Sequence, residues 1–467
     1  MPKAFFMHHL AALASAALLT LPFLPAATAQ EAAMPSDAEI AQILGDRIGR
    51  DQANIGIAVA VIENGETRFV SHGTIAADST IAVDEHTIFE AGSITKLFTN
   101  LLLAQLVNAG RIDLDAPITD YLPEGTILPQ QGDRAITAFD LATHSAGLSG
   151  LPEDLQARGL DNPYSGYGAE GIFAWLASYD LPRPIGESFD YSNVGTALLA
   201  QAIEHVSGAD FAGLLQRNIL DPLGMTETSL ALTGQPLPER ASGHDAAGEI
   251  VPHWDFDAFA PAGGLLTSAA DLAKFIAAAS GAVDSSMTED FETMLARTRP
   301  AGSDSIALGW FITDTGQGEI VWHNGITGGF RSFAGFERQS GNGVVVLTNM
   351  VTQAGIEDIG MHLLDPALPL REQPKPRVAV DIDPALLSGY AGDYLLAPGV
   401  VLTVTSEDGR LFAQLTGQPR IEIFPESETS FFYKIVDAQI GFAVEDGKAK
   451  SLVLHQNGQN MPALRVE

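Results

Sequence analysis

The sequence of 467 residues contains no cysteine. Disulfide bonds, thiolate catalysis, cysteine-ligated zinc and iron–sulfur clusters are therefore excluded. Basic residues are scarce. The chain has 25 Lys and Arg and 58 Asp and Glu, which gives a formal net charge of −33. This charge disfavours nucleic acid and anionic lipid as partners. It mainly favours solubility, although attraction of a cationic substrate stays open.

Long apolar runs are also rare. One, from about Leu10 to Leu24, follows Lys3 and precedes Ala27-Thr28-Ala29. Basic, apolar and small residues in this order are typical of a cleavable secretory signal. A retained anchor is the alternative, but two prolines interrupt the run, which is shorter than the ~20 apolar residues that a membrane span requires. We predict a signal peptide over residues 1–29 and a periplasmic or secreted protein without stable membrane insertion.

The length of the chain predicts two folded domains, because a single core stops growing at roughly 250–300 residues. Several prolines mark residues 366–378 as a linker between domains at 35–365 and 379–467. The first domain has two strands around an Asn64-Gly65 turn, then helices, then strands again. This order predicts an α+β fold, in which an antiparallel sheet built from both ends of the domain is flanked by helices and carries a helical lobe.

The individual elements follow from apolar periodicity and turn residues. Helices are predicted at 93–108, 138–144, 172–178, 194–206, 211–218 and 269–279, and late strands at 306–312, 319–323, 330–338 and 343–349. In the last ~90 residues, short alternating runs are joined by Asp-Gly and Asn-Gly steps, which are favoured in hairpins. The steps are Asp408-Gly409, Asp446-Gly447 and Asn457-Gly458. This part is predicted to be a small all-β domain, a barrel or a sandwich.

Ser93-Ile94-Thr95-Lys96 is the first motif with catalytic chemistry. Positions three apart share one face of a helix, so the Ser93 hydroxyl and the Lys96 amine are expected to lie together. A serine hydroxyl is a poor nucleophile until a base takes its proton, and a neutral lysine is such a base. Its pKa must fall by about 3 units for this role near pH 7, a shift that burial and another nearby cation are able to supply. Taken alone, the pattern is more often a helix-capping serine followed by a surface lysine.

Two further motifs follow along the chain. Tyr191-Ser192-Asn193 precedes a helix and offers a phenol that relays protons and an amide that bonds a substrate carbonyl or a lysine. His323-Asn324-Gly325 ends a strand and offers an electrostatic clamp and backbone N–H groups for an oxyanion. Each pattern alone has an ordinary structural explanation. S-x-x-K, Y-x-N and H-x-G each occur once, in this order, and each lies at the edge of an element.

The three motifs together resemble those of the serine β-lactamase and penicillin-binding-protein superfamily, in its class C-like branch. The resemblance extends from about Ile55 to Met350 through FEAGSITK, LATHSAGL, PIGESFDYSNVGTALL, DPLGMTETS, PAGGLLTSAADLAKF and HNGITGGFRS. It implies a β-lactamase/penicillin-binding-protein-like fold. The C-terminal part is similar to the lipocalin-like extension of some peptidase members, where it shapes the cleft or mediates oligomerisation.

The resemblance also implies a role for each site residue. Ser93 is the acylated nucleophile, and Lys96 is its base, sharing the proton with Tyr191. Asn193 holds the substrate amide and orients the lysine. His323 and Gly325 occupy the place of a lysine-containing motif in many relatives, and the backbone N–H groups of Ser93 and Ile326 form the oxyanion hole. A histidine here resembles aminopeptidase-type and carboxylesterase-like members, and it binds a substrate carboxylate less strongly than lysine does.

The resulting prediction is a serine hydrolase that acts on amide or ester bonds through an acyl-enzyme. D-amino-acid peptides or related cell-wall fragments are the leading substrates, with β-lactams as mimics that acylate the same serine, and a β-lactamase stays open. A promiscuous carboxylesterase is one alternative, and a penicillin-binding protein that is acylated without turnover is another. No metal or cofactor is expected. Gly166-x-Gly168-x-x-Gly171 matches a dinucleotide pattern, but no strand precedes it and we interpret it as a loop near the cleft. His144 is expected to pack or cap a turn.

Overall fold

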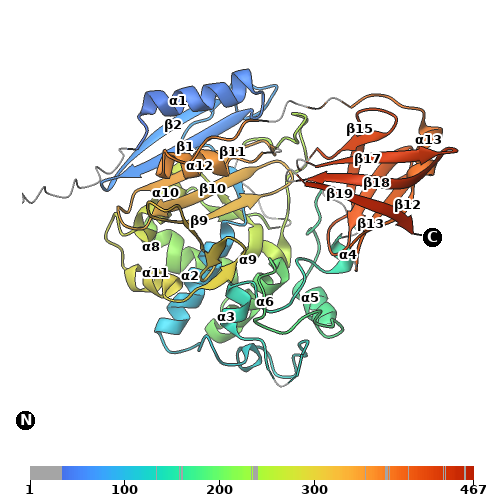
Figure 1. Cartoon of the computed structure of the whole chain (residues 1–467). Helices are drawn as coiled ribbons and strands as arrows, with labels where there is room; N and C mark the ends of the chain where they lie inside the picture. Colours follow the sequence, from blue (N-terminus) through green and yellow to red (C-terminus); the bar gives the residue numbers. More distant parts are fainter. Residues whose placement is uncertain are drawn as a thin grey trace, which may run out of the picture. The chain divides into compact units, whose positions relative to one another are not determined.

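The computed structural model describes residues 34–132, 134–156, 158, 161–232, 234, 240–352, 354–373, 377, 379–397, 399–434, 436, 438–456 and 459–466. The described residues form the predicted α+β fold, an antiparallel sheet with helices, followed by a closed barrel of eight strands (Figure 1). The predicted signal peptide, the Asn457-Gly458 step and part of the predicted linker lie outside these residues.

The helices and strands have the following bounds. The helices are α1 (Asp37–Gly45), α2 (Thr95–Asn108), α3 (Ala138–Ala142), α4 (Glu153–Gln156), α5 (Ala169–Leu176), α6 (Asn193–Ser207), α7 (Phe211–Leu215), α8 (Asp221–Leu223), α9 (Ala260–Gly263), α10 (Ala269–Ala279), α11 (Thr288–Leu295), α12 (Glu357–Leu364) and α13 (Pro384–Tyr390). The strands of the first domain are β1 (Gly56–Glu63), β2 (Glu66–Gly73), β3 (Phe89–Gly92), β4 (Ser229–Leu230), β5 (Leu265–Thr267), β6 (Arg299–Ala301), β7 (Asp304–Ile306), β8 (Phe311–Asp314), β9 (Glu319–Ile326), β10 (Arg331–Glu337) and β11 (Gly343–Thr348).

The large sheet has the order β2-β1-β11-β10-β9-β8-β7-β6, so strands from the two ends of the domain, β1 and β11, pair within one antiparallel sheet, as predicted. In β1, Ile57, Val59 and Val61 belong to one apolar cluster, and the alternate residues belong to another. This alternation follows from the two-residue period of a strand. The first cluster is covered by α1 and α12, and the second by α10 and the helical lobe (Figure 1).

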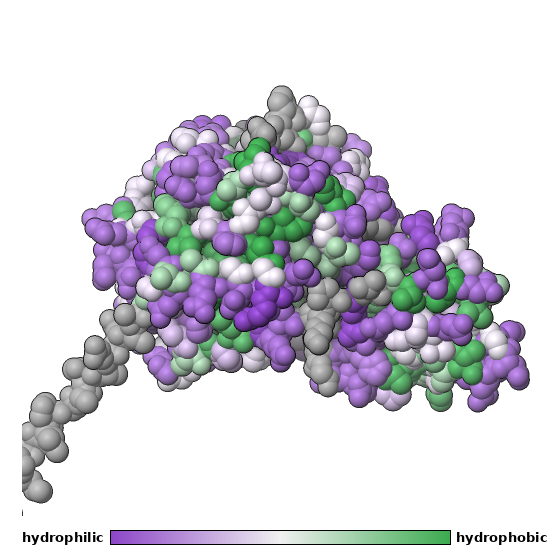
Figure 2. All heavy atoms as spheres, turned by 90° about the horizontal axis from the view of Figure 1, so that it is seen from above, coloured by the Kyte–Doolittle hydropathy of each residue, from purple (hydrophilic) through white to green (hydrophobic). Residues whose placement is uncertain are grey.

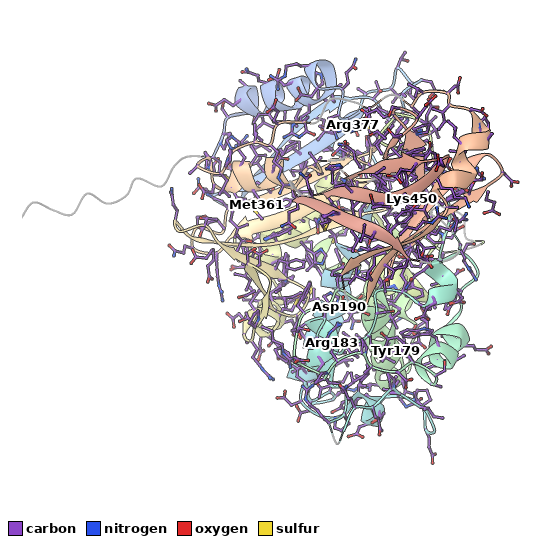
Figure 3. All side chains as sticks on the ribbon, turned by 45° about the vertical axis from the view of Figure 1, so that its right-hand side comes forward. Tyr179, Arg183, Asp190, Met361, Arg377 and Lys450 are labelled. Carbon is purple, nitrogen blue, oxygen red and sulfur yellow. The ribbon has the colours of Figure 1, made fainter. Side chains whose placement is uncertain are left out.

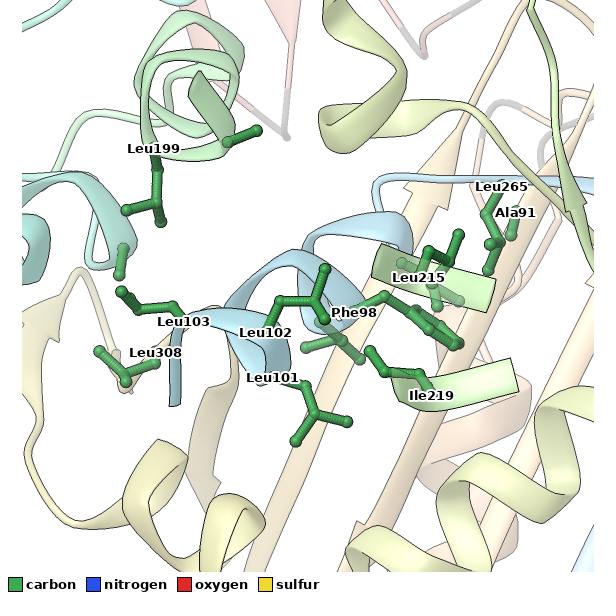
Figure 4. Packing of buried hydrophobic residues seen from close by; sticks show 14 of the residues in the cluster. Ala91, Phe98, Leu101, Leu102, Leu103, Leu199, Leu215, Ile219, Leu265 and Leu308 are labelled. Atoms are coloured by element: carbon green, nitrogen blue, oxygen red, sulfur yellow. The ribbon is translucent and has the colours of Figure 1, made fainter. Parts of the chain in front are cut away.

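Helix α2 lies at the centre of the larger core (Figure 4). Its consecutive residues Leu101, Leu102 and Leu103 are all buried, together with Phe98, which stacks on Phe275 of α10 at 4.2 Å between ring centroids. A helix that is apolar all round requires neighbours on every side. The fold therefore fixes α2 rigidly, and this matters because Lys96 is part of it.

Two of the predicted elements need correction. The strand expected at 306–312 is two strands, β7 and β8, because Gly309 has φ +79° and the Ala307 amide bonds the Trp310 carbonyl at 2.8 Å, which closes a turn. The helix expected from Ser93 begins at Thr95, so Ser93 lies in the turn before it. The predicted two-strand start is confirmed, with Asn64 and Gly65 both at positive φ.

The C-terminal part is a closed barrel in which the first strand pairs with the last. Its strands are β12 (Gly392–Ala397), β13 (Val400–Glu407), β14 (Arg410–Leu415), β15 (Ile421–Pro425), β16 (Ser430–Phe432), β17 (Ala438–Glu445), β18 (Lys448–Gln456) and β19 (Gln459–Val466). Asp408-Gly409 and Asp446-Gly447 form the predicted turns with positive φ. Buried side chains, Tyr394 and Phe431 among them, fill the interior. Of the two predicted forms, the barrel is the one observed.

One face of the surface combines hydrophilic and hydrophobic residues. Figure 2 shows a face on which hydrophilic residues surround smaller hydrophobic patches. Within the described part of the chain, no helix combines the length and apolar character needed to cross a bilayer.

One buried ion pair fixes α12 to the end of α1. Arg47 and Asp358 are bonded with side-chain exposures of 4% and 2%. We expect Asp358→Ala to lower the free energy of unfolding by about 3–5 kcal/mol, because it leaves a buried guanidinium without its charge partner. The exposed pair Arg338–Glu319 provides the control, since Glu319→Gln should cost less than about 1 kcal/mol. Chemical denaturation measures both changes, and equal losses would contradict the assignment.

Candidate active site

Ser93 and Lys96 lie where β3 passes into α2. The half-buried Ser93 occupies the connecting turn, and the Lys96 amide bonds the Ser93 carbonyl at 3.0 Å. Their side chains also meet, because the Lys96 Nζ atom lies 3.1 Å from Ser93 Oγ. The Thr95 hydroxyl bonds the Gly92 carbonyl at 2.6 Å and holds the turn in place. The structure thus brings together the hydroxyl and the amine that the spacing predicts.

The Lys96 amine has two further neighbours, and both are pure acceptors. Nζ lies 2.7 Å from Asn193 Oδ1 and 2.6 Å from the Ala262 carbonyl oxygen. A neutral amine has two hydrogens and one lone pair. When the two hydrogens go to these oxygens, the lone pair is left for the hydrogen of the Ser93 hydroxyl. The contacts therefore suit an amine that accepts a proton from serine.

The surroundings of Lys96 favour this neutral form. The side chain is fully buried, and burial holds the pKa of Lys96 well below its usual range. Among the described residues, no carboxylate forms an ion pair with this amine. No counter-charge in that set therefore offsets the cost of removing an ammonium from water.

Tyr191 reaches the site from the segment before α6, and Asn193 is the first residue of that helix. Main-chain bonds fix this segment, since the Asp190 amide donates to the His144 carbonyl at 2.7 Å and the Asn193 amide to the Gly150 carbonyl at 3.1 Å. An ion pair between Arg183 and Asp190 adds a side-chain anchor (Figure 3). The Tyr191 ring lies 4.8 Å from Lys96 Nζ. The predicted phenol and amide are therefore both beside the lysine.

The Tyr191 hydroxyl is buried. Burial raises the pKa of Tyr191, and the nearby Ser93 hydroxyl lowers that pKa by a smaller amount. The two hydroxyls nevertheless fall short of hydrogen-bond geometry, and Tyr191 Oη has no bonded partner among the described residues. A buried hydroxyl of this kind is able to bond a substrate atom that enters between Ser93 and Tyr191.

His323 approaches from β9, with its ring centroid 6.3 Å from that of Tyr191. Its Nδ1 atom lies 2.5 Å from the Asn324 carbonyl oxygen, while Nε2 is buried without a bonded partner in the described chain. Burial lowers the pKa of His323 to about 3. The imidazole is therefore neutral at physiological pH, so the expected electrostatic clamp is a hydrogen-bonding group rather than a charge.

Gly325 and Gly92 allow two main-chain segments to approach closely. A Cβ atom on Gly325 would lie 2.0 Å from the Ala91 carbonyl oxygen, and one on Gly92, which has φ +53°, would lie 2.8 Å from the Ile326 nitrogen. The Ser332 hydroxyl bonds the same Ala91 carbonyl at 2.7 Å. The strand that carries the third motif is thus held against the turn that carries Ser93. The two amides proposed for the oxyanion hole, those of Ser93 and Ile326, belong to these adjoining segments.

A cavity of about 240 Å³ opens beside Ser93. This volume lies below the ~300–1,000 Å³ of pockets for drug-sized ligands, so the cavity suits one substrate group. Its walls are mainly apolar and include Leu151, Leu155, Tyr164, Trp254, Phe256 and Phe259. The sequence analysis missed these residues, because aromatic residues scattered over a hundred positions give no motif. Only the glycine-rich loop that follows Tyr164 was predicted to lie near the cleft.

Comparison with known proteins places this geometry in a family. Residues 37–360 match the family described as Beta-lactamase. The chain belongs to the β-lactamase family. Residues 376–464 match a second family, a domain of unknown function named DUF3471.

Individual members of the β-lactamase family are similar over most of this chain. Penicillin-binding protein 4* of Bacillus subtilis is 25% identical over 82% of this chain and 88% of its own length. The D-alanyl-D-alanine-carboxypeptidase/endopeptidase AmpH of Escherichia coli K12 is 25% identical over 66% of this chain and 83% of its own. An octameric penicillin-binding protein homologue from Pyrococcus abyssi has the same fold, with a TM-score of 0.62 at 22% identity over 92% of this chain and all of that chain. This β-lactamase-family chain is thus a hydrolase of the serine β-lactamase and penicillin-binding-protein group, related to proteins named carboxypeptidases.

His144 is closer to the site of this β-lactamase-family domain than the sequence analysis expected. Its ring packs on that of Tyr191 with centroids 4.4 Å apart, and its Nδ1 atom accepts the Ser192 amide hydrogen at 3.2 Å. Burial lowers the pKa of His144 well below its usual range, so the ring is neutral. The predicted packing role is therefore carried out directly against the phenol, at a residue with φ +52°.

The close approach at Gly325 gives a prediction for this β-lactamase-family site. We expect Gly325→Ala to lower kcat/KM by about 10²-fold or more, because the added methyl group pushes β9 away from Ser93 and reacting groups tolerate little displacement. Gly49→Ala is the matched control, since a Cβ atom there has no neighbour within 4 Å. Turnover of a chromogenic ester and thermal unfolding are measured for both variants. Wild-type turnover by Gly325→Ala would show that the approach is not required.

Proposed function

We propose that this protein hydrolyses amide or ester bonds through an acyl-enzyme on Ser93. The supporting observation is the arrangement at Lys96, where a fully buried amine faces two carbonyl-type oxygens and one hydroxyl. In that arrangement Lys96 itself is the base for the serine, so the proposed mechanism requires neither a carboxylate base nor a metal ion. Membership of a family of serine hydrolases supports the same chemistry.

The proposed reaction has two stages. Ser93 Oγ attacks the substrate carbonyl carbon while its proton passes to Lys96, and the carbonyl oxygen becomes an oxyanion that accepts hydrogen bonds from the Ser93 and Ile326 amides. Collapse of this intermediate breaks the bond to the leaving group, which takes a proton through Tyr191. Water then attacks the acyl ester, releases the acid and restores the serine hydroxyl. Asn193 orients the lysine and binds the acyl part of the substrate.

D-amino-acid peptides or related cell-wall fragments are the leading substrate class, with β-lactams as mimics that acylate the same serine. The relatives named carboxypeptidase and penicillin-binding protein support this choice. The carboxylesterase alternative has one specific observation in its favour. His323 is neutral, with a pKa of about 3, and so offers a substrate carboxylate no charge. A protein that traps acyl groups without turnover is distinguished from both by the experiment below.

The test compares acylation and turnover in the mature protein and in Ser93→Ala. D-amino-acid anilides, D-Ala-D-Ala peptides, nitrophenyl esters and a chromogenic cephalosporin are supplied as substrates. We expect Ser93→Ala to lose about four or more orders of magnitude in kcat, and mass spectrometry to find the acyl group on Ser93 in the wild type. Ser388→Ala, an exposed serine of α13, is the control and should react normally.

Each outcome has a defined meaning. An acyl adduct on a residue other than Ser93 would overturn the proposed mechanism. A stable adduct on Ser93 without turnover of any substrate would replace the hydrolase with an acyl-trapping protein. Turnover of esters alone would remove D-peptides as the substrate class and leave the esterase.

A further inference from the structure

Some residues that line the cavity beside Ser93 take no part in the proposed proton transfer. Tyr191, which is proposed to protonate the leaving group, is close to His144 and His323. Asn193 contacts a different aromatic residue, because its Nδ2 atom donates to the Tyr164 hydroxyl at 3.3 Å. Since the proposed reaction gives the leaving group to Tyr191, we assign the acyl group to Asn193 and Tyr164.

Aromatic residues form the cavity wall at Tyr164. The Tyr164 ring stacks on Phe256 with centroids 5.0 Å apart and contacts Phe259 at 5.1 Å and Trp254 at 5.7 Å. Leu151 and Leu155 add an aliphatic surface. Rings packed against one another in this way have few alternative positions, so the wall is rigid. It presents carbon surface to whatever the cavity holds.

The polar groups of the cavity are all uncharged. Among the described residues that line it, none is Lys, Arg, His, Asp or Glu. Burial raises the pKa of Tyr164, so its phenol stays protonated. The Asn193 amide accepts from Lys96 at Oδ1 and donates one Nδ2 hydrogen to Tyr164, which leaves its second Nδ2 hydrogen, a neutral donor, for the substrate. A charged acyl group would thus lose its water without gaining a counter-charge, which is strongly unfavourable.

We infer that the acyl-binding part of this site selects uncharged, apolar acyl groups, aromatic or medium-length aliphatic, and excludes acyl groups that carry a carboxylate. The inference rests on the proposed function and adds the class of acyl donor to it. Apolar surface removed from water supplies the attraction. The net charge of −33 acts in the same direction, since it repels anionic substrates from the protein as a whole.

The test uses nitrophenyl esters that share a leaving group and differ only in the acyl part. Pentanoate and the glutarate half-ester have the same length, and only the second carries a carboxylate. The 3-phenylpropanoate ester probes the aromatic wall, and a 4-(trimethylammonio)butanoate ester carries the opposite charge. We expect kcat/KM for pentanoate and phenylpropanoate to exceed that for the glutarate half-ester by about 100-fold or more, and the cationic ester to be a poor substrate as well.

Ile326 provides a variant that changes the charge without disturbing the core. Its side chain lines the cavity and is 42% exposed. Ile326→Lys is expected to raise the ratio of half-ester to pentanoate turnover by about tenfold, because it brings a cation to the acyl group. Ile326→Met, of similar reach and without charge, is the matched control and should leave that ratio unchanged.

The outcomes separate this inference from the proposed function. Equal kcat/KM values for pentanoate and the half-ester, with the acyl group found on Ser93, would overturn the inference and leave the proposed function standing. An unchanged ratio in Ile326→Lys would overturn the placement of the acyl group. The absence of any adduct on Ser93 with all four esters would overturn the proposed function and the inference with it.

Discussion

The structure depends on the burial of one amine. Lys96 lies in a helix that is packed on all sides, and its Nζ atom is held within hydrogen-bond distance of Ser93, Asn193 and the Ala262 carbonyl. Burial of Lys96 disfavours the charged form of its amine. The three elements that supply these contacts are far apart in the sequence. The core that joins them is therefore what buries the amine beside the serine.

A second constraint concerns the main chain. Gly92 and Gly325 let the turn before α2 approach the end of β9 more closely than any side chain would permit. This contact joins the helical part of the site to the sheet. It explains in physical terms why the third motif contains a glycine and why Ile326 lies next to the turn that carries Ser93. The proposed chemistry thus needs both the buried Lys96 side chain and main-chain segments that carry no side chain at Gly92 and Gly325.

The sequence predicted the chemical groups better than their surroundings. Spacing was sufficient to place Ser93 beside Lys96, since the two are joined by one local turn although the helix itself begins at Thr95. Alternation was sufficient to predict the sheet and the hairpins of the barrel. The aromatic wall at Tyr164 and the contact of His144 with Tyr191 depend on long-range packing, which leaves no local pattern. The neutrality of His323 has the same origin, because burial is a property of the fold. Export, and oligomerisation through the barrel, stay predictions.

The central claim is that Lys96 is neutral at physiological pH, and a titration of lysine ¹³Cε resonances tests it directly. The Lys96 signal is identified by its absence from Lys96→Met. We expect it to titrate well below the usual ~10.4 of lysine, and acylation of Ser93 to be lost as the pH falls through that same pKa, since only the neutral amine accepts the proton. A Lys96 signal that stays protonated at neutral pH and titrates near the usual value would contradict the account.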